Sequence, residues 1–212
     1  MNLMIRPFAQ NNFPELTENP AAVFSAIILV SAALLAAFFI SRYVAALYKG
    51  NKKTAAFFFI GITAVVIVLL FAFFGCAAIT VKGIIFCLIL TYASYEDIRT
   101  RECDDYIHLM IVIAAFIGTS ITSFPFMFMS ALLVGSVIFI TTVITKTHIG
   151  GADIKLSAAC AFMLGTARGF TGLTVGLIIA VIVNTIKNKK NKKAGFPLIP
   201  YLAAGFTAAY FI

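Results

Sequence analysis

The sequence predicts an all-α membrane protein, a polytopic helical bundle of about eight transmembrane helices. Apolar residues make up 62% of the 212 residues, and the mean hydropathy is +1.04. Charged residues make up 11%, whereas a soluble domain has about 25%. The apolar runs are continuous and do not alternate with polar residues, which excludes a transmembrane β-barrel.

The order of the apolar runs predicts where the helices lie. A helix needs about 20 apolar residues to cross the hydrocarbon core. Such runs are expected at 21–41, 54–74, 77–97, 106–123, 126–145, 153–167, 170–186 and 196–212. The sixth run is short, so we expect it to be tilted or to begin in a water-accessible cavity. The predicted organisation is an arm at 1–20, two helices within 21–74, and a membrane domain at 75–212.

The N-terminal arm does not have the pattern of a signal peptide. It contains Arg6 but also Pro7, Pro14 and Pro20, with no short apolar core before a small-residue cleavage site. We therefore expect residues 1–20 to precede the first membrane helix as an extracytoplasmic segment.

The positive charges predict the orientation in the membrane. If the eight runs all cross, thirteen of the sixteen Lys and Arg residues fall on one side: Arg42, Lys49, Lys52, Lys53, Arg99, Arg101, Lys146, Lys155, Lys187, Lys189, Lys190, Lys192 and Lys193. Arg6, Lys82 and Arg168 fall on the other. The positive-inside rule makes the first side cytoplasmic and places both termini outside the plasma membrane.

The basic residues do not predict a nucleic-acid partner. They are spread over four loops without interleaved aromatic residues. The run "KNKKNKK" at 187–193 is instead expected to bind anionic lipid head groups. Cys76, Cys87, Cys103 and Cys160 show no C-x-x-C spacing, so we expect no zinc or other metal site and no cofactor.

Glycines predict close helix packing near the end of the chain. Gly165 and Gly169, and then Gly172 and Gly176, stand at G-x-x-x-G spacing, which lets helices approach closely in lipid. Gly169 is expected in the short turn between the sixth and seventh helices.

The acidic residues gather at two places on the predicted cytoplasmic side. Five lie in "YEDIRTRECDDYIHL", residues 95–109: Glu96, Asp97, Glu102, Asp104 and Asp105. The sixth is Asp153, in "GGADIKL" at 150–156. Carboxylates therefore meet the membrane at the end of the third helix and at the start of the sixth.

Each of these residues also has a purely structural interpretation. Asp153 opens a helix, where an acid caps free N–H groups and meets the positive end of the dipole. Asp97 stands where the dipole disfavours an anion, although Arg99 and Arg101 can compensate it or the helix can continue into the cytosol.

The exposed charges of the same segments are open to two interpretations as well. Glu102, Asp104 and Asp105 fit a solvated loop. Lys155 either acts on a nearby carboxylate or substrate carbonyl, or extends toward the head groups.

Two carboxylates at one membrane depth predict a specific chemistry. Like charges held close together cannot both ionise cheaply, so one carboxyl keeps its proton. The ionised partner then activates a water while the protonated one polarises a carbonyl. This chemistry needs no metal, cysteine or histidine, and ionisable residues in membrane helices are candidates for function.

Three segments resemble the type IV prepilin peptidases, a family of polytopic aspartic endopeptidases. "DIRTRECDDYIHL" from Asp97 is similar to the family's D-x-R-x-R-x-I-P-N, and "GGADIKL" to its G-x-G-D-x-K-L. "FPLIPYLAAG" at 196–205 is similar to I-P-F-G-P-F-L-A-x-G. The likeness covers roughly residues 83–205, with the segments in the family's order, so 75–212 would be the catalytic membrane domain.

The resemblance implies that Asp97 and Asp153 are the catalytic pair. The implied reaction is cleavage of the short basic leader of pilin-like precursors at the cytoplasmic face, in type IV pilus assembly or protein secretion. Gly150, Gly151 and Lys155 would belong to the substrate site. An acidic patch of Glu102, Asp104 and Asp105 would attract the basic leader.

The sequence departs from the family pattern at several positions. Cys103, Asp104 and Asp105 stand where the family has isoleucine, proline and asparagine. Ala152 replaces a glycine, and Leu198 and Ile199 replace phenylalanine and glycine. Bifunctional members also carry a methyltransferase region with paired C-x-x-C motifs between the first two helices. The dozen residues at 42–53 hold no cysteine, so we expect cleavage without N-methylation.

Three other functions share some of these sequence features. A presenilin-like protease would have tyrosine directly before its first aspartate and a later P-A-L motif. Here Glu96 separates Tyr95 from Asp97, and the late motif is "FPLIP". A transporter would place polar groups at the midplane, whereas these charges gather at one edge. A non-enzymatic assembly factor with the same fold is the third possibility. The sequence does not specify the oligomeric state.

Overall fold

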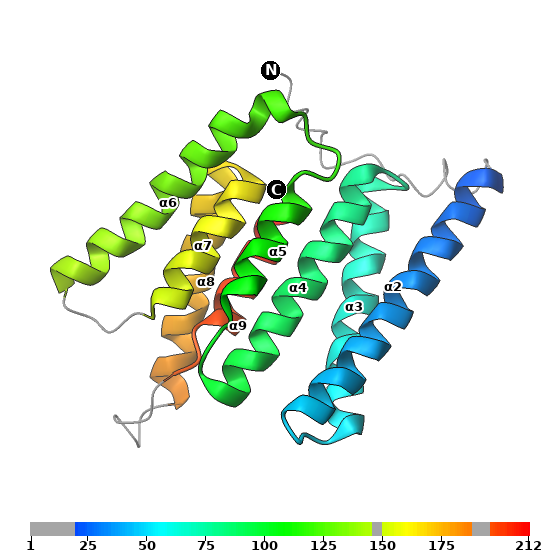
Figure 1. Ribbon diagram of the computed structural model, residues 1–212, viewed down its shortest axis with the longest axis horizontal. Coiled ribbons are helices and arrows are strands. Elements are labelled where there is room, and N and C mark those ends of the chain that lie inside the picture. The colour runs from blue at the N-terminus through cyan, green and yellow to red at the C-terminus, as the bar shows by residue number, and fades with distance from the viewer. Residues whose placement is uncertain (1–19, 146–149, 188–195) are drawn as a thin grey trace. The chain divides into compact units, whose positions relative to one another are not determined.

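All the regular structure in the described part of the chain is helical. The computed structural model describes residues 20–145, 150–187 and 196–212, and its elements appear in chain order in Figure 1. They are α2 (Pro20–Leu47), α3 (Lys52–Phe74), α4 (Ala78–Thr100), α5 (Asp105–Ala115), the 3-10 turn η1 (Ile121–Ser123), α6 (Phe124–Thr145), α7 (Gly151–Leu164), α8 (Thr166–Lys187) and α9 (Ile199–Tyr210).

Five of these helical segments are long and apolar enough to cross a membrane, which confirms a multi-pass membrane protein. They are Pro20–Leu47, Lys52–Phe74, Ala78–Thr100, Ile121–Ile144 and Thr166–Ile186. The remaining helices, α5, α7 and α9, have 11, 14 and 12 residues. At 1.5 Å per residue they extend only about 17 to 21 Å, less than the roughly 30 Å hydrocarbon core. The expected number of eight spans is therefore not confirmed.

Backbone conformation explains where two of the predicted boundaries were wrong. The run at 106–123 was expected to be one helix, but α5 ends at Ala115 and Gly118 adopts a φ of 65°. This left-handed conformation is one that glycine adopts without cost, and it ends the helix. The third run extends beyond residue 97 because α4 continues to Thr100, and Arg101 then turns the chain with a φ of 60°.

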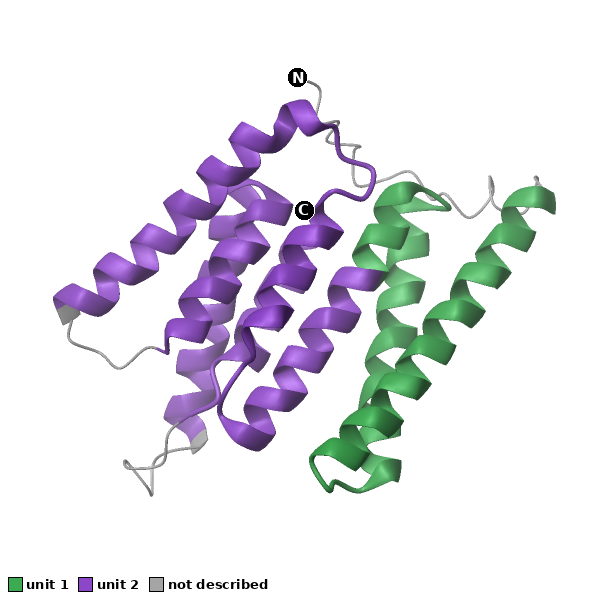
Figure 2. Ribbon diagram, in the orientation of Figure 1, with its two compact units in different colours: residues 1–84 green, residues 85–212 purple. Residues whose placement is uncertain are grey.

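The chain divides into two compact units, residues 1–84 and 85–212, coloured separately in Figure 2. In the first, α2 and α3 pack together as a helical hairpin. Residues 48–51 connect them, and the Asn51 side chain accepts a hydrogen bond from the Lys53 N–H at 2.9 Å. The three predicted domains stay a prediction, and the arm falls outside the described residues apart from Pro20.

The second unit is built around α7. This helix packs against α5, α6, α8 and α9, and Leu156, Cys160 and Ala161 on it are completely buried. The aromatic side chains of Tyr92 on α4 and Tyr106 on α5 contact each other through their hydroxyls. Figure 1 shows α7 and α8 beside α6 in this unit. A central helix that is covered on several sides holds its first turn, and therefore Asp153, in a defined place.

Glycines on facing helices bring α8 and α9 into backbone contact. A Cβ atom on Gly205 would overlap the carbonyl oxygen of Gly172 and the backbone nitrogen of Gly176. The expected close packing is confirmed at Gly169, Gly172 and Gly176 but not at Gly165, where an added Cβ would meet nothing within 4 Å. Gly169 was expected in a turn, but it lies within α8, where an added Cβ would be 2.8 Å from the Ala161 side chain. The turn is made instead by Gly165, with a φ of 86°.

Candidate active site

The candidate site lies where four helix ends of the second unit come together. The last turn of α4 supplies Glu96 and Asp97, and the first turn of α7 supplies Asp153. The start of α9 and the segment leading into α5 complete it. The start of α5 follows α4 directly, whereas the starts of α7 and α9 are far from α4 in the sequence, so only the fold of the second unit makes them its neighbours.

Asp97 is held by the start of α9. Its side chain is buried, with 7% of the residue exposed, and its Oδ2 accepts the backbone N–H of Ile199 at 3.0 Å. The end of α4 presents carbonyl groups that disfavour an anion, whereas the start of α9 presents N–H groups that favour one. Arg101 adds an attractive and Glu96 a repulsive Coulomb interaction with this carboxylate. The terminal segment therefore orients Asp97 and offsets the unfavourable dipole of its own helix.

Asp153 occupies the first turn of α7, where its Oδ2 accepts the backbone N–H of Gly150 at 3.2 Å. This confirms the helix-capping interpretation of the residue. The cap leaves the carboxylate free for a second interaction, because each oxygen of a carboxylate accepts more than one hydrogen bond. The negative charge of Asp97 acts on Asp153 as the largest Coulomb contribution at that carboxyl. Capping and proximity to a second carboxylate thus occur together.

The thiol of Cys103 feels the charges of both aspartates. Burial, and to a smaller extent the negative charges of Glu96, Asp97, Asp104 and Asp153, together raise the pKa of this thiol to about 12. A thiolate here would be both desolvated and repelled. Cys103 is therefore a protonated thiol among carboxyl groups and is not a nucleophile.

Glu96 is a site residue to which the sequence pattern assigned no role. It is only 4% exposed, and its Oε2 accepts the backbone N–H of Asp104 at 3.4 Å. This bond attaches the end of α4 to the start of α5 across the turn at 101–104. In the same turn, the Thr100 hydroxyl accepts the Glu102 N–H at 3.2 Å. Burial of a second acid directly beside Asp97 could not be read from its spacing in the sequence.

The predicted acidic patch is divided by an ion pair. Asp105 and Lys155 are joined at 2.6 Å between Oδ1 and Nζ, and both side chains are well exposed. The hydrogen bond and charge of Lys155 lower the pKa of Asp105. Glu102 and Asp104 are exposed as well. In this structure Lys155 links α7 to α5 by acting on a nearby carboxylate, one of the two interpretations that the sequence allowed, and that carboxylate is the one of Asp105.

His108 and Gly150 determine how the first turn of α7 is placed. The His108 Nε2 lies 3.2 Å from the Ala152 carbonyl oxygen, and this histidine is buried between α5 and α7. An added Cβ on Gly150 would stand 3.1 Å from the Asp153 Oδ2, whereas one on Gly151 would meet nothing within 4 Å. Of the two glycines predicted for the site, only Gly150 therefore leaves room beside the carboxylate.

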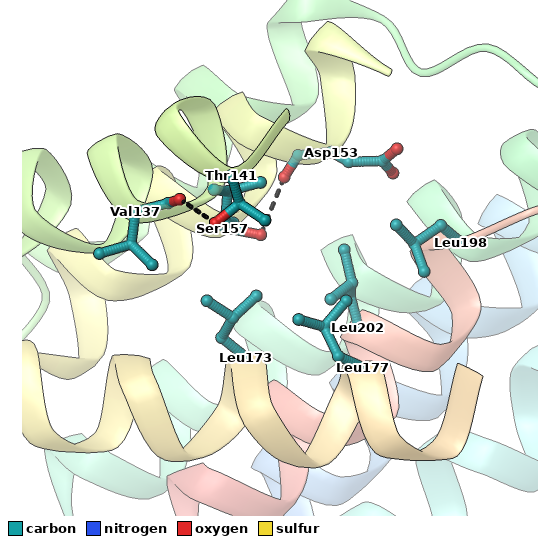
Figure 3. A pocket seen from close by; sticks show the side chains of 9 residues that line it. Val137, Thr141, Asp153, Ser157, Leu173, Leu177, Leu198 and Leu202 are labelled. Carbon is teal, nitrogen blue, oxygen red and sulfur yellow. Dashed lines mark hydrogen bonds between the residues drawn. The ribbon is translucent and has the colours of Figure 1, made fainter. Parts of the chain in front are cut away.

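An apolar cavity of about 70 Å³ adjoins Asp153. Figure 3 shows Asp153 and Ser157 of α7 facing Leu173 and Leu177 of α8 across it. Leu198 and Leu202, before and within α9, close another side. A pocket next to a candidate catalytic carboxylate is a place for part of a substrate.

The fold and the site together define a multi-pass helical membrane protein with two interacting carboxylates at the ends of its helices. Residues 84–186 match the model of the type IV leader peptidase family, so the resemblance noted in the sequence is confirmed over this segment. The match includes Asp97 and Asp153, lies almost entirely within the second unit, and supports a protease. No curated protein and no solved structure matches the chain.

Proposed function

We propose that this protein is an aspartic endopeptidase that cleaves the basic leader of pilin-like precursors, with Asp97 and Asp153 as its catalytic pair. The carrying observation is that the carboxylates of Asp97 on α4 and Asp153 on α7 interact electrostatically with each other and with the same half-buried thiol, that of Cys103. The family match over residues 84–186 supports peptidase activity on a leader sequence. The assignment of the two aspartates, the substrate and the membrane side belong to the proposal.

The proposed reaction is hydrolysis of one peptide bond by water. One carboxylate takes a proton from the water, whose oxygen adds to the carbonyl carbon, while the protonated carboxyl donates to the carbonyl oxygen. The tetrahedral intermediate then loses the C–N bond as a proton passes to the leaving nitrogen. Asp97 accepts the Ile199 N–H and is attracted by the charge of Arg101, so it is assigned the role of the base. Asp153 then carries the proton that polarises the carbonyl.

The substrate is proposed to be a short basic leader followed by an apolar helix in the membrane. Glu102 and Asp104 are exposed next to the site and can attract a basic leader at long range. Asp105 contributes less to this attraction, because Lys155 compensates its charge. If all eight apolar runs cross the membrane, thirteen of the sixteen Lys and Arg residues fall on the same side as the two aspartates, which supports a cytoplasmic site. No nucleic-acid partner is proposed.

Cleavage is proposed to occur without N-methylation. Residues 48–51 are all that connects α2 to α3, and so short a connection leaves no room for a methyltransferase region. The purified protein should then release a leader without transferring a methyl group from S-adenosylmethionine. Incorporation of a labelled methyl group into the product would contradict this part of the proposal.

The test is cleavage of a co-expressed pilin-like precursor, followed as a gel shift and confirmed by the mass of the product. Asp97→Asn and Asp153→Asn should each abolish the shift while the variant stays in the membrane, because asparagine keeps the shape of the side chain and cannot exchange the proton. Lys52→Gln is the control, since it removes an exposed charge at the start of α3, outside the site and outside the segment that matches the family. Continued cleavage by either aspartate variant would refute the dyad. The dyad is supported if both aspartate variants fail to cleave the precursor while the control variant still cleaves it.

A further inference from the structure

The peptide group that joins Ala152 to Asp153 is held at both of its polar atoms. Its N–H, on Asp153, donates to the Gly150 carbonyl oxygen at 3.1 Å. Its carbonyl oxygen, on Ala152, lies 3.2 Å from the Nε2 of His108. The first bond is local to the start of α7, whereas the second comes from α5. Because the Cα of Asp153 lies in the plane of this peptide group, any shift of the turn relative to α5 moves the carboxyl as well.

The contact with Ala152 determines which nitrogen of His108 carries a proton. A carbonyl oxygen only accepts hydrogen bonds, so Nε2 must be the donor. The residue is 7% exposed, and burial lowers the pKa of its imidazole. At pH 7 the ring of His108 is therefore neutral, with its proton on Nε2 and with Nδ1 as an acceptor.

The other ring nitrogen of His108 gains nothing comparable. Nδ1 is buried and has no hydrogen-bond partner among the residues that the structure describes. The Asp105 Oδ1 is 3.8 Å from it, and Lys155 holds that same oxygen at 2.6 Å. Asp105 of α5 and Lys155 of α7 are the charged groups that act on the ring. A buried polar atom without a partner costs free energy, so the presence of a histidine here calls for a reason other than stability.

We infer that His108 is a positioning residue for the proposed reaction, and that the proton on its Nε2 fixes where the start of α7 presents the carboxyl of Asp153. The inference rests on the proposed function and adds to it a residue of α5. His108 acts through the peptide group of residues 152 and 153 and exchanges no proton with the substrate. Both carboxylates must meet one carbonyl group, and a misplacement of about 1 Å can cost about a hundredfold in rate.

Glutamine and asparagine at position 108 separate the roles of the two ring nitrogens. The amide of glutamine reaches about as far as Nε2 and can donate to the Ala152 carbonyl. The amide of asparagine is one carbon shorter and stands near the place of Nδ1. With a pilin-like precursor as substrate, His108→Gln should keep most of kcat. His108→Asn should lower kcat by about ten- to a hundredfold and change KM little, because the lost bond acts on the reacting carboxyl.

Ile111→Val is the structural control. Ile111 is completely buried about one turn further along α5. The loss of one methyl group disturbs the packing of the same helix without removing a hydrogen bond. This variant should be less stable to unfolding in mixed micelles and should keep its kcat. A purely structural role of His108 predicts instead that kcat follows stability across all three variants.

The proton on Nε2 can be observed directly, without any substrate. The chain contains two histidines, His108 and His148, so His148→Gln leaves His108 as the only imidazole. Its nitrogen-15 NMR signals at pH 7 should show a proton on Nε2 and none on Nδ1. A neutral ring with its proton on Nδ1 would overturn the inference, because Nε2 could not then donate to the Ala152 carbonyl.

The outcomes separate this role of His108 from the peptidase activity. If the intact protein cleaves the precursor and the glutamine and asparagine variants have equal kcat, the inference is wrong. It is also wrong if kcat falls only in step with stability. If His108→Asn does not fold, the nitrogen-15 spectrum decides. If the intact protein cleaves no precursor, the proposed function itself fails, and the positioning role falls with it.

Discussion

Replacing Gly205 by alanine is the sharpest test of how α9 is held in place. The added methyl group would overlap backbone atoms of Gly172 and Gly176 on α8. Backbone atoms in a helix cannot turn aside as a flexible side chain can, so the two helices must separate. Overpacking of this kind costs about 1 to 3 kcal/mol. Alanine regains up to about 1 kcal/mol over glycine through helix propensity. If the overpacking costs about 3 kcal/mol, the free energy of unfolding therefore falls by roughly 2 kcal/mol.

The loss is measured as the free energy of unfolding in mixed detergent and SDS micelles. Gly61→Ala is the matched control, because an added Cβ there meets nothing within 4 Å inside α3; it should be neutral or slightly stabilising. Gly205→Ala should also lower cleavage activity, since α9 carries the Ile199 N–H that holds Asp97. If the two alanine variants are equally stable, the close approach of α8 and α9 is wrong.

Two further predictions concern charges around the site. In a protein whose only cysteine is Cys103, alkylation at pH 8 should be at least about a hundredfold slower than that of a free thiol, because a pKa of about 12 leaves little thiolate. Asp97→Asn should accelerate this reaction, because it removes a negative charge that opposes formation of the thiolate. An unchanged rate would mean that Asp97 is not close to the Cys103 thiol. The pKa of Asp105 is lowered because Lys155 stabilises its ionised form. The ion pair therefore stabilises the fold above about pH 4, where an ordinary aspartate is ionised. This contribution is lost at lower pH, as the carboxylate of Asp105 becomes protonated. Asp105→Asn should therefore lower the free energy of unfolding slightly at pH 7, and should leave it unchanged at a pH below the pKa of Asp105. A loss of stability that persists in acid or in high salt would contradict the ion pair.

The long helices could be predicted from the sequence because their signal is local. A continuous apolar run reports burial or lipid contact on all sides, so α2, α3, α4, α6 and α8 were placed within a few residues. The same signal overstated α5, because hydropathy does not register the left-handed Gly118 that follows its end. Short helices such as α7 and α9 depend on packing against neighbours for their stability, which makes their lengths hard to predict.

The site could be predicted only in part for the same reason. Asp97 and Asp153 were found because acids are rare in this chain and because the segments resemble a known family. The bond from the Ile199 N–H to Asp97 joins residues about a hundred positions apart through a backbone group, which carries no sequence signature. The pair between Lys155 and Asp105 likewise depends on the contact between α5 and α7.

The central claim is that Asp97 and Asp153 act as one catalytic unit, and a comparison of single and double variants tests it most directly. The initial rate of leader release would be measured for the intact protein in lipid, for Asp97→Asn, for Asp153→Asn and for the double variant. Residues that act as a unit are strongly non-additive. Each single change should therefore lower kcat by at least about a thousandfold, and the double variant should be no slower than the singles. Two partial losses that multiply in the double variant would show that the two carboxylates work independently, and the account would be wrong.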